Sequence, residues 1–484
     1  MNKNFEALEP QAVWRHFVNI MNTPHPSHHE DGIRSYVKSV AESNSLECIE
    51  DEVGNILIRK GASEGMEQRP CVVLQAHLDM VPQKNNDKEF DFTRDAIEGY
   101  IDGDWVTANG TTLGADNGIG VAAALAVVED RLIKHGAIEV LLTSNEECGM
   151  DGAFGLKGDL LQGEILLNLD TEDDDELCIG CAGGLDLVAR FDHEVVPTPQ
   201  GDYVARRLEV KGLRGGHSGC QIHEQRANAN KLLFRFLRFT KTDILLCGVE
   251  GGTLRNAIAR EAHADILCHV DDLEALEQQV KNYEQTIRTE YATIEDSVEI
   301  TLREIDYPQT MIDEDSASCM VWAIAGCPDG VAKMSYTMHG LVQTSSNLAI
   351  VRCEGSQSRV ELFLRSSSES EKSALADQIA SVFELSDAEV ECEGGHPGWM
   401  PNPTSPIVAQ MVENYRTLFG EEPHVRAVHA GLECGLIGSI YPQMDMISFG
   451  PTIVSPHSPD ERVKIDSVGR FYKLLIYTLE NLKG

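Results

Sequence analysis

The chain has 484 residues, more than one ordinary hydrophobic core holds, so two or three domains are expected. Its 78 acidic and 40 basic side chains give a net charge of −38. Such an acidic surface repels nucleic acid and anionic membranes, whose phosphates are bound through Lys and Arg, and it mildly favours cationic or zwitterionic ligands. The charge by itself is typical of a solubilising surface, and the 42% hydrophobic content is ordinary for a globular protein.

Targeting and redox signals indicate a cytoplasmic protein. The first ten residues have no basic region followed by an apolar stretch, so no secretory signal is predicted. No window approaches about 18 uninterrupted apolar residues, so no membrane span is predicted either. Thirteen scattered cysteines, an odd number, do not form a disulfide framework. The C-x-x-C pair Cys178 and Cys181 lacks a thioredoxin-like setting and the second pair of a zinc site, so buried thiols are expected.

The N-terminal third alternates apolar runs with helical patterns. Strands are predicted at 71–76, 137–143 and 164–168, and a helix rich in small residues at 121–128. Strands that alternate with helices are typical of an α/β domain with a mainly parallel sheet.

The pattern changes after about residue 187 and suggests a β-α-β-β-α order. The predicted elements are a strand at 204–210, a helix at 226–239, strands around Ala257 and Ile266, and a helix at 273–287.

A weak internal echo follows this region. Thr253-Leu-Arg-Asn256 is matched by Thr344-Ser-Ser-Asn347, and each precedes an apolar strand, a turn, another strand and an acidic helix. The echo predicts two copies of one α+β unit, and chance similarity is the alternative.

The α/β pattern returns at residue 398 and ends in a helix at 467–482. This order predicts a discontinuous domain, 1–186 with 398–484, and an inserted domain, 187–397. A duplication would place its two copies at about 187–305 and 306–397.

Polar side chains follow the predicted strands, where ligands bind in open α/β sheets. His77 follows the strand 71–76, and Asp79 shares its face because alternate residues of an extended segment point the same way. A metal-ligating imidazole is commonly oriented by such a carboxylate. A single His at a strand end is also commonly structural, so this motif is weak alone.

Asp116 stands among glycines, in Gly114-Ala-Asp-Asn-Gly-Ile-Gly120, before the small-residue helix. The glycines permit close approach, and the carboxylate is suited to bridging two cations. The alternative is a dinucleotide fingerprint, because Gly118-Ile-Gly-Val-Ala-Ala123 imitates G-x-G-x-x-A. That fingerprint follows a buried strand directly, whereas the polar loop 107–116 precedes it here, and this disfavours the nucleotide interpretation.

Two further strand ends carry carboxylates. Glu146 and Glu147 follow the strand 137–143, and Asp170 follows the strand 164–168. Adjacent glutamates are usually solvated, but after a buried strand one can reach a metal and the other a water molecule, as hydrolysis requires.

His457 supplies a second imidazole, far along the chain on the proline-rich loop 451–462. The inserted domain accounts for this separation. Two imidazoles and three carboxylates suit zinc, with cobalt or manganese as substitutes, and structural zinc would instead prefer a closed cysteine-rich site. The predicted ligands are His77, Asp116, Glu147, Asp170 and His457.

Together these motifs resemble one family, the co-catalytic zinc peptidases that include carboxypeptidases, aminoacylases, tripeptidases and dipeptidases. The blocks are His77-Leu-Asp-Met-Val, Gly114-Ala-Asp-Asn-Gly-Ile-Gly, Asn145-Glu-Glu-Cys-Gly, Asn168-Leu-Asp and Ser455-Pro-His-Ser-Pro-Asp-Glu. The resemblance covers essentially the whole chain, in order. It implies a zinc-peptidase-like α/β domain, with a mainly parallel mixed sheet flanked by helices, and an inserted α+β lid.

The resemblance also implies roles for the ligands. Asp116 is expected to bridge two divalent ions, with His77 and Asp170 completing one site and Glu147 and His457 the other. The Asp116–Asn117 peptide is expected to be cis.

Further roles are implied near the metals and in the lid. Glu146 resembles the general base and proton shuttle, and Asp79 the carboxylate that orients the first imidazole. His217, in Gly215-Gly-His-Ser-Gly, is similar to the lid histidine that polarises the scissile carbonyl. Asn256 and Arg365 resemble lid residues that hold the substrate and its C-terminal carboxylate.

The implied activity is metal-dependent hydrolysis of dipeptides, including Xaa-His and β-alanyl-histidine, by a water that bridges the two ions with Glu146 as general base. One alternative is an N-acyl- or N-carbamoyl-amino-acid hydrolase with the same metal centre. The other is a catalytically dead peptide-binding protein, which would be free to lose the base or a ligand. Small peptides are the expected partners. The subunit number stays open, a homodimer included, because relatives with a single lid unit dimerise through it.

Overall fold

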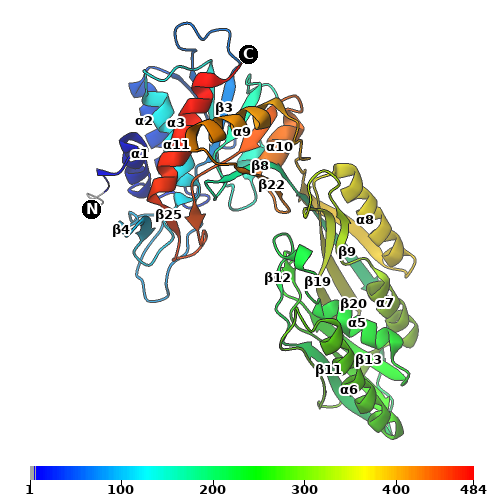
Figure 1. Ribbon diagram of the computed structural model, residues 1–484. Coiled ribbons are helices and arrows are strands. Elements are labelled where there is room, and N and C mark those ends of the chain that lie inside the picture. Colours follow the sequence, from blue (N-terminus) through cyan, green and yellow to red (C-terminus); the bar gives the residue numbers. More distant parts are fainter. Residues whose placement is uncertain (1–4, 6, 484) are drawn as a thin grey trace. The chain divides into compact units, whose positions relative to one another are not determined.

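The computed structural model describes residue 5 and residues 7–483, which divide into two compact units. Unit 1 comprises 1–180, 401–427 and 432–484, and unit 2 comprises 181–400 and 428–431. In Figure 1 the N-terminal part of unit 1 is blue to cyan, its C-terminal part is orange to red, and unit 2 is mainly green and yellow. The domain boundaries that we derived from the sequence stay a prediction.

Unit 1 is an α/β unit with helices on a mixed sheet. Its helices are α1 (Gln11–Met21), α2 (Asp31–Ser43), α3 (Ala115–Glu129), α4 (Asp151–Phe154), α9 (Pro406–Phe419), α10 (Glu433–Ile440) and α11 (Ile465–Asn481). The eight strands of the sheet run in the order β1 (Glu47–Glu50), β2 (Ile56–Lys60), β6 (Ile138–Thr143), β3 (Val72–His77), β7 (Ile165–Asn168), β23 (Asp445–Ser448), β8 (Glu176–Cys181) and β22 (His424–Val428). A smaller sheet has the order β24 (Ile453–Val454), β25 (Arg462–Lys464), β5 (Trp105–Ala108) and β4 (Gly99–Asp102).

The centre of the large sheet is parallel. Strands β6, β3, β7 and β23 run in one direction, and β1, β2 and β8 add antiparallel pairs around them. The predicted α/β fold with a mixed sheet is confirmed. The carboxyl ends of β6, β3 and β7 therefore lie together at one edge of the sheet.

Helix α3 lies buried between α1 and β3. Every residue from Gly118 to Val128 is buried, and most of these residues are Gly, Ala or Val. Small side chains allow a helix to approach its neighbours closely on all sides. The predicted small-residue helix is confirmed, and its N-terminus is held close to the carboxyl end of β3.

Unit 2 is an α+β unit with one antiparallel sheet. Its helices are α5 (Ala229–Phe239), α6 (Leu273–Glu290), α7 (Glu314–Gly326) and α8 (Glu369–Glu384), with short 3-10 turns η2 (Ile222–Glu224) and η3 (Val270–Asp272). The sheet order is β16 (Glu299–Glu304), β11 (Tyr203–Lys211), β15 (Ala262–His269), β13 (Ile244–Gly251), β19 (Val342–Glu354), β20 (Gln357–Ser366), β9 (Gly183–Asp192) and β21 (Glu389–His396), and β18 (Gly330–Met334) pairs with β19. Two small pairs complete it, β10 (Val195–Pro197) with β17 (Thr310–Ile312) and β12 (Gly216–His217) with β14 (Ala257–Ile258).

The sheet of unit 2 has two halves with the same element order. One half runs β11, α5, β13, β15, α6, β16, and the other runs β9, α7, β19, β20, α8, β21. The halves meet where β13 pairs with β19. Strand β9 precedes the first half in the chain but pairs with β20 and β21, so the first half is nested within the second.

One predicted strand differs from the structure. The segment around Ala257 forms only the two-residue strand β14, and the strand that precedes β15 in the chain and pairs with it is β13, at 244–251. Gly252, with φ of 73°, turns the chain after β13, and the exposed residues 253–256 form the connection. In the sequence, the apolar run that forms β13 directly precedes these turn glycines.

Two glycines in helices test how closely the chain is packed near the site. A Cβ on Gly120 of α3 would lie 2.4 Å from Asn117 Oδ1 and 2.7 Å from Leu169 O, whereas one on Gly469 of α11 would meet only Glu9 O at 3.8 Å. We expect Gly120→Ala to lower the free energy of unfolding by about 1–3 kcal/mol because it overpacks the core. Gly469→Ala is the control and is expected to raise it by about 0.5–1 kcal/mol through helix propensity. Urea denaturation measures both, and a stabilised Gly120→Ala protein would contradict the packing described for α3.

Candidate metal centre

The predicted ligands converge at the carboxyl edge of the parallel strands in unit 1. His77 is the last residue of β3, Glu147 lies in the turn after β6, and Asp170 follows β7. Because these three strands are neighbours, their carboxyl ends bring one imidazole and two carboxylates together. The other two ligands, Asp116 and His457, reach this edge from loops.

Asp116 lies at the start of α3, where its backbone is not helical, and the Asp116–Asn117 peptide is cis as predicted. Asn117 Nδ2 donates to Leu169 O at 2.8 Å, which ties the helix start to the end of β7. His457 lies between β24 and β25 with a left-handed φ of 58°.

The five side chains form two groups that share Asp116. His77 Nε2 lies 3.2 Å from Asp116 Oδ1 and 3.5 Å from Asp170 Oδ1. His457 Nε2 lies 3.1 Å from Asp116 Oδ2 and 3.0 Å from Glu147 Oε2. In each group the candidate ligand atoms lie within 4.8 Å of one another. The pairing of ligands is the one that the family resemblance implies.

The chemistry of this set fits two divalent cations. Glu147 Oε1 and Asp170 Oδ1 are buried and have no hydrogen-bond partner among the described residues. Buried carboxylate oxygens normally have a donor or a cation beside them. Mixed imidazole and carboxylate donors of this kind suit zinc, cobalt or manganese.

The electrostatics of the cluster also indicate a need for positive charge. Burial raises the pKa of Asp170 to about 6, and Asp116 and Glu147 add to the rise while His77 opposes it. The pKa of His457 is raised to about 11, chiefly by hydrogen bonds to Asp116 and Glu147. The pKa of His77 is also well above its ordinary value: burial opposes the rise, and neighbouring carboxylates, Asp170 foremost, outweigh it. The acidic groups thus favour positive charge at this edge of the sheet.

Asp79 lies behind the first imidazole and holds the two glutamates. One carboxylate oxygen is 3.4 Å from His77 Nδ1, and the two oxygens accept hydrogen bonds from the backbone N–H groups of Glu146 at 2.9 Å and Glu147 at 3.2 Å. Burial tends to raise the pKa of Asp79, but the His77 imidazole and these donors, with Ser27, hold it below the usual value. An ionised Asp79 can therefore orient the imidazole and position the turn.

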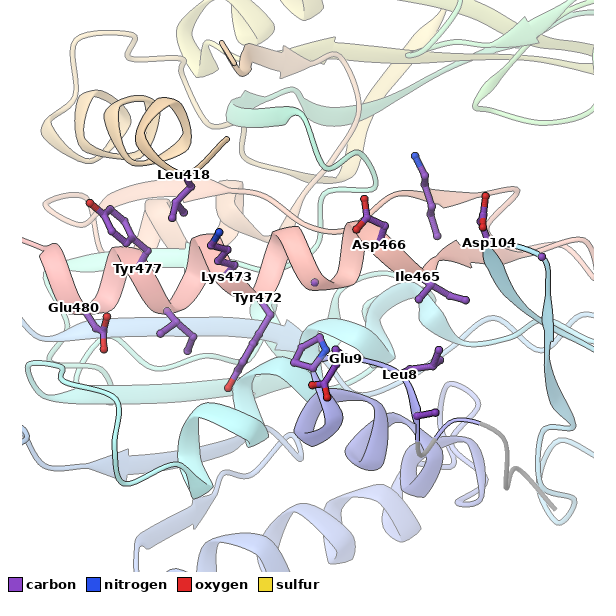
Figure 2. A pocket seen from close by; sticks show the side chains of 16 residues that line it. Leu8, Glu9, Asp104, Leu418, Ile465, Asp466, Tyr472, Lys473, Tyr477 and Glu480 are labelled. Carbon is purple, nitrogen blue, oxygen red and sulfur yellow. The ribbon is translucent and has the colours of Figure 1, made fainter. Parts of the chain in front are cut away.

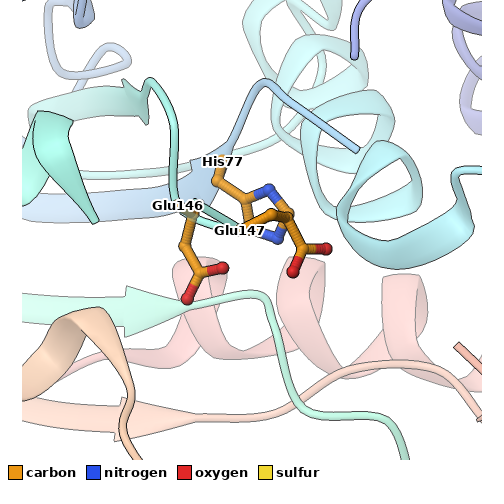
Figure 3. Close-up of side chains that lie close together, drawn as sticks. All are labelled: His77, Glu146 and Glu147. Atoms are coloured by element: carbon orange, nitrogen blue, oxygen red, sulfur yellow. The ribbon is translucent and has the colours of Figure 1, made fainter. Parts of the chain in front are cut away.

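Glu146 and Glu147 point in different directions from this turn. In Figure 3 their carboxylates lie on opposite sides of the His77 ring. Glu147 contacts His457, whereas no hydrogen bond to the Glu146 carboxylate is found among the described residues. Burial raises the pKa of Glu146 well above its ordinary value, and Asp170 and other nearby carboxylates add to the rise. A carboxylate with a raised pKa and no partner can accept and return a proton.

A buried glutamate near the cluster was not predicted. Glu433, the first residue of α10, accepts hydrogen bonds through Oε2 from Gln75 Nε2 at 2.6 Å and Thr143 Oγ1 at 2.7 Å. Its other oxygen has no partner in the described part of the chain, and burial raises its pKa to about 7. No local motif marked it, because both of its donors lie about 300 or more residues earlier.

Unit 2 holds a separate cluster around Arg365, on β20. The side chain is 5% exposed, and no carboxylate of the described residues lies within ion-pair distance of it. Burial lowers its pKa to about 10, which leaves the guanidinium charged at neutral pH. A buried cation without an anionic partner is costly, so this cluster is suited to an anionic ligand.

His217, on β12, faces this guanidinium. Its Nδ1 accepts hydrogen bonds from the N–H groups of Gly219 and Cys220, both at 3.1 Å, so the neutral ring carries its proton on Nε2. Burial and Arg365 lower the pKa of His217, which keeps the ring neutral. The Nε2–H group and the Arg365 Nη2 donor are 3.4 Å apart, and one oxygen could accept from both.

The structure brings His217 and Arg365 together and places Asn256 at their side. Asn256 lies in the exposed connection after β13, and its carbonyl oxygen accepts from Ser218 N at 2.8 Å. The side chain of the buried Asn347 donates to the carbonyl oxygens of the two residues that flank Asn256, Arg255 at 3.1 Å and Ala257 at 2.9 Å. Asn256 and Asn347, matched by the sequence echo, therefore lie in a turn and in a strand respectively.

A large groove lies elsewhere on unit 1. It has a volume of about 1020 Å³ and is lined by the segment 7–10 and by one face of α11, including Tyr472 and Tyr477 (Figure 2). None of the predicted site residues lines it. Among the described residues, none of the helices combines the length and the apolar character that a membrane span requires.

Comparisons with known proteins identify the family of this chain. Residues 73–481 match the peptidase family M20/M25/M40. The chain is 45% identical over 479 residues to the cytosol non-specific dipeptidase of Escherichia coli strain K12, a match that covers 98% of each protein. It is 43% identical to the crystal structure of an aminoacylhistidine dipeptidase from Vibrio alginolyticus, with a TM-score of 0.94 over 99% of this chain and 98% of the other. A tripeptidase from Staphylococcus aureus, 16% identical with a TM-score of 0.57 over 98% of this chain and 99% of the other, shares the fold.

Proposed function

Because the chain belongs to peptidase family M20/M25/M40, we propose that it is a metal-dependent dipeptidase, with Xaa-His and β-alanyl-histidine dipeptides among its substrates. The observation that carries the proposal is the pair of ligand groups that share the two oxygens of Asp116. The names of two relatives above 40% identity, both dipeptidases, support the substrate class.

The metal centre of the proposed enzyme is formed by unit 1. His77, Asp116 and Asp170 would hold one ion, and Asp116, Glu147 and His457 the other, with zinc as the proposed metal and cobalt or manganese as substitutes. Two such ions supply Lewis acidity, which lowers the pKa of water and polarises a peptide carbonyl.

Glu146 is the proposed general base. Its carboxylate takes the proton of the attacking water and delivers it to the departing amine nitrogen. Asp79 keeps this residue in place through the backbone of the turn and orients His77 from behind. Glu146 would thus carry the proton beside the metal ligands, and Asp79 would position both Glu146 and His77.

The cluster in unit 2 is the proposed site for oxygen atoms of the substrate. Arg365 binds the C-terminal carboxylate, His217 donates to the carbonyl oxygen of the scissile bond, and Asn256 helps to hold the peptide. The buried guanidinium without a carboxylate partner supports this assignment. A site that binds this carboxylate together with the scissile carbonyl oxygen would favour cleavage of the bond before the C-terminal residue.

The remaining proposals concern the setting of the enzyme. The cytosolic name of the E. coli relative supports a cytoplasmic location. A homodimer, and the absence of nucleic-acid and membrane partners, stay predictions from the sequence.

The function is tested with purified protein and a Glu146→Gln variant. We expect the parent to hydrolyse dipeptides in the presence of Zn²⁺, to lose activity with a chelator, and to leave N-acetylated amino acids intact. The variant is expected to lose about 10²–10⁴-fold in kcat, because an amide cannot accept the proton, while it still binds metal.

Glu164→Gln, at an exposed position directly before β7, is the control and is expected to keep full activity. Faster cleavage of N-acetylated amino acids than of dipeptides by the parent would contradict the proposed substrate class. A fully active Glu146→Gln variant would contradict the assigned base.

The carboxylate site is tested with Arg365→Ala. Loss of a charge-assisted hydrogen bond worth about 1.5–3 kcal/mol should raise KM for dipeptides about 10–100-fold. The same peptides with an amidated C-terminus should show little further change, because they lack the group that Arg365 binds. Arg359→Ala, at an exposed position of the same strand, should leave both substrates unaffected. Equal effects of Arg365→Ala on the acid and the amide would rule out this role.

A further inference from the structure

Glu461 is the last residue of the motif that carries His457, and its side chain has no role in the proposed mechanism. The residue is 2% exposed, and its carboxylate lies against the loop that leads into α3. Oε2 accepts hydrogen bonds from the backbone N–H groups of Leu113 at 2.7 Å and Gly114 at 3.0 Å. Oε1 accepts from Ala115 at 2.8 Å and Asp116 at 3.2 Å. One carboxylate thus binds four successive backbone N–H groups.

Three of these donors, the N–H groups of Gly114, Ala115 and Asp116, lie at the start of α3. The first N–H groups of a helix have no acceptor within it, and an anion there is favoured by the helix dipole. The residue before α3 is Gly114, which has no side chain to cap the helix. The left-handed φ of Gly114, 71°, turns the neighbouring N–H groups toward one side. Glu461 supplies the missing acceptors from a segment about 345 residues away.

The segment that carries Glu461 is itself fixed. The backbone N–H group of Glu461 donates to Ser458 O at 3.0 Å, and the Glu461 carbonyl oxygen accepts from Thr107 Oγ1 at 2.8 Å. The next residues pair as β25 with β5. His457, four residues before Glu461, lies on the same loop, so Glu461 connects the backbone that carries one imidazole with the backbone that carries Asp116.

We propose that Glu461 is a positioning residue for the metal centre: by binding the N–H groups of residues 113–116, it holds the Asp116 carboxylate between His77 and His457. The proposal rests on the metal centre of the proposed function but not on its substrate. Bond lengths to a metal tolerate errors of only about 0.2 Å, so a small shift of the Asp116 backbone affects both ligand groups at once. Groups that orient metal ligands typically contribute about 10–100-fold to metal affinity.

The test measures Zn²⁺ affinity of the metal-free protein by competition with a chelating dye, without any peptide. In Glu461→Gln one oxygen is replaced by an NH₂ group, which cannot accept from two of the backbone donors. We expect the affinity to fall about 10–100-fold. Glu461→Asp keeps both oxygens on a shorter side chain, and its affinity should lie between those of the parent and the Gln variant.

Glu139→Gln is a matched control. Glu139, on β6, is also 2% exposed and accepts backbone hydrogen bonds from Gln162 at 2.7 Å and Gly163 at 3.0 Å, but it binds no residue of the metal centre. Both Gln variants should lower the thermal midpoint of the metal-free protein. Only Glu461→Gln should weaken the binding of Zn²⁺.

An unchanged affinity in Glu461→Gln, or an equal loss in Glu139→Gln, would overturn the proposal. Should Glu461→Gln fail to fold, as judged by circular dichroism, Glu461→Asp decides by the same criterion, and an unchanged affinity sinks the proposal. A parent that binds Zn²⁺ but cleaves no dipeptide would refute the proposed substrate. The Zn²⁺ affinities of the Glu461 variants would still test the positioning role. A parent that binds no Zn²⁺ would overturn both.

Discussion

The carboxylate of Asp116 stands between two imidazoles, and the arrangement of the site depends on this contact. One oxygen faces His77 and the other faces His457, and each imidazole has a second carboxylate beside it, Asp170 or Glu147. Buried carboxylates this close together repel one another unless cations lie between them. A centre for two divalent ions therefore follows from the charges as well as from the family to which the chain belongs.

The fold of unit 1 serves this contact in two ways. His77, Glu147 and Asp170 lie at one edge of the sheet because they end or follow three neighbouring parallel strands. Ligands commonly bind at this edge of an open α/β sheet. The closely packed helix α3 and the smaller sheet hold the loops that bring Asp116 and His457 to the same edge. Unit 2 contributes different chemistry, a buried guanidinium and a neutral imidazole that both offer donors to an oxygen.

The convergence of His77, Glu147 and Asp170 was predictable because each ends or follows a segment with a strong local signal. The buried strands before His77, Glu147 and Asp170 are short apolar runs, and the residue after such a run is visible without knowledge of the fold. The grouping of Asp116 and His457 with them needed the order of several motifs together, since the two residues lie 341 positions apart.

Other features had no local signal. Glu433 binds partners about 300 or more residues away, and a buried glutamate looks like a surface one in sequence. Glu461 ends a motif, but that motif does not report its contacts with the loop before α3. The nesting of one half of unit 2 within the other depends on the pairing of β9 with β20, which periodicity does not report. The strand β13 was not predicted, and the motif at Asn256, which resembles a strand start in sequence, forms a turn in the structure.

A crystal structure of the zinc-loaded protein, with anomalous scattering recorded at the zinc edge, tests the shared carboxylate most directly. Two peaks about 3.5–4 Å apart are expected, with one oxygen of Asp116 bound to each ion. A single peak, or two ions that have no common ligand in Asp116, would contradict this account of the site.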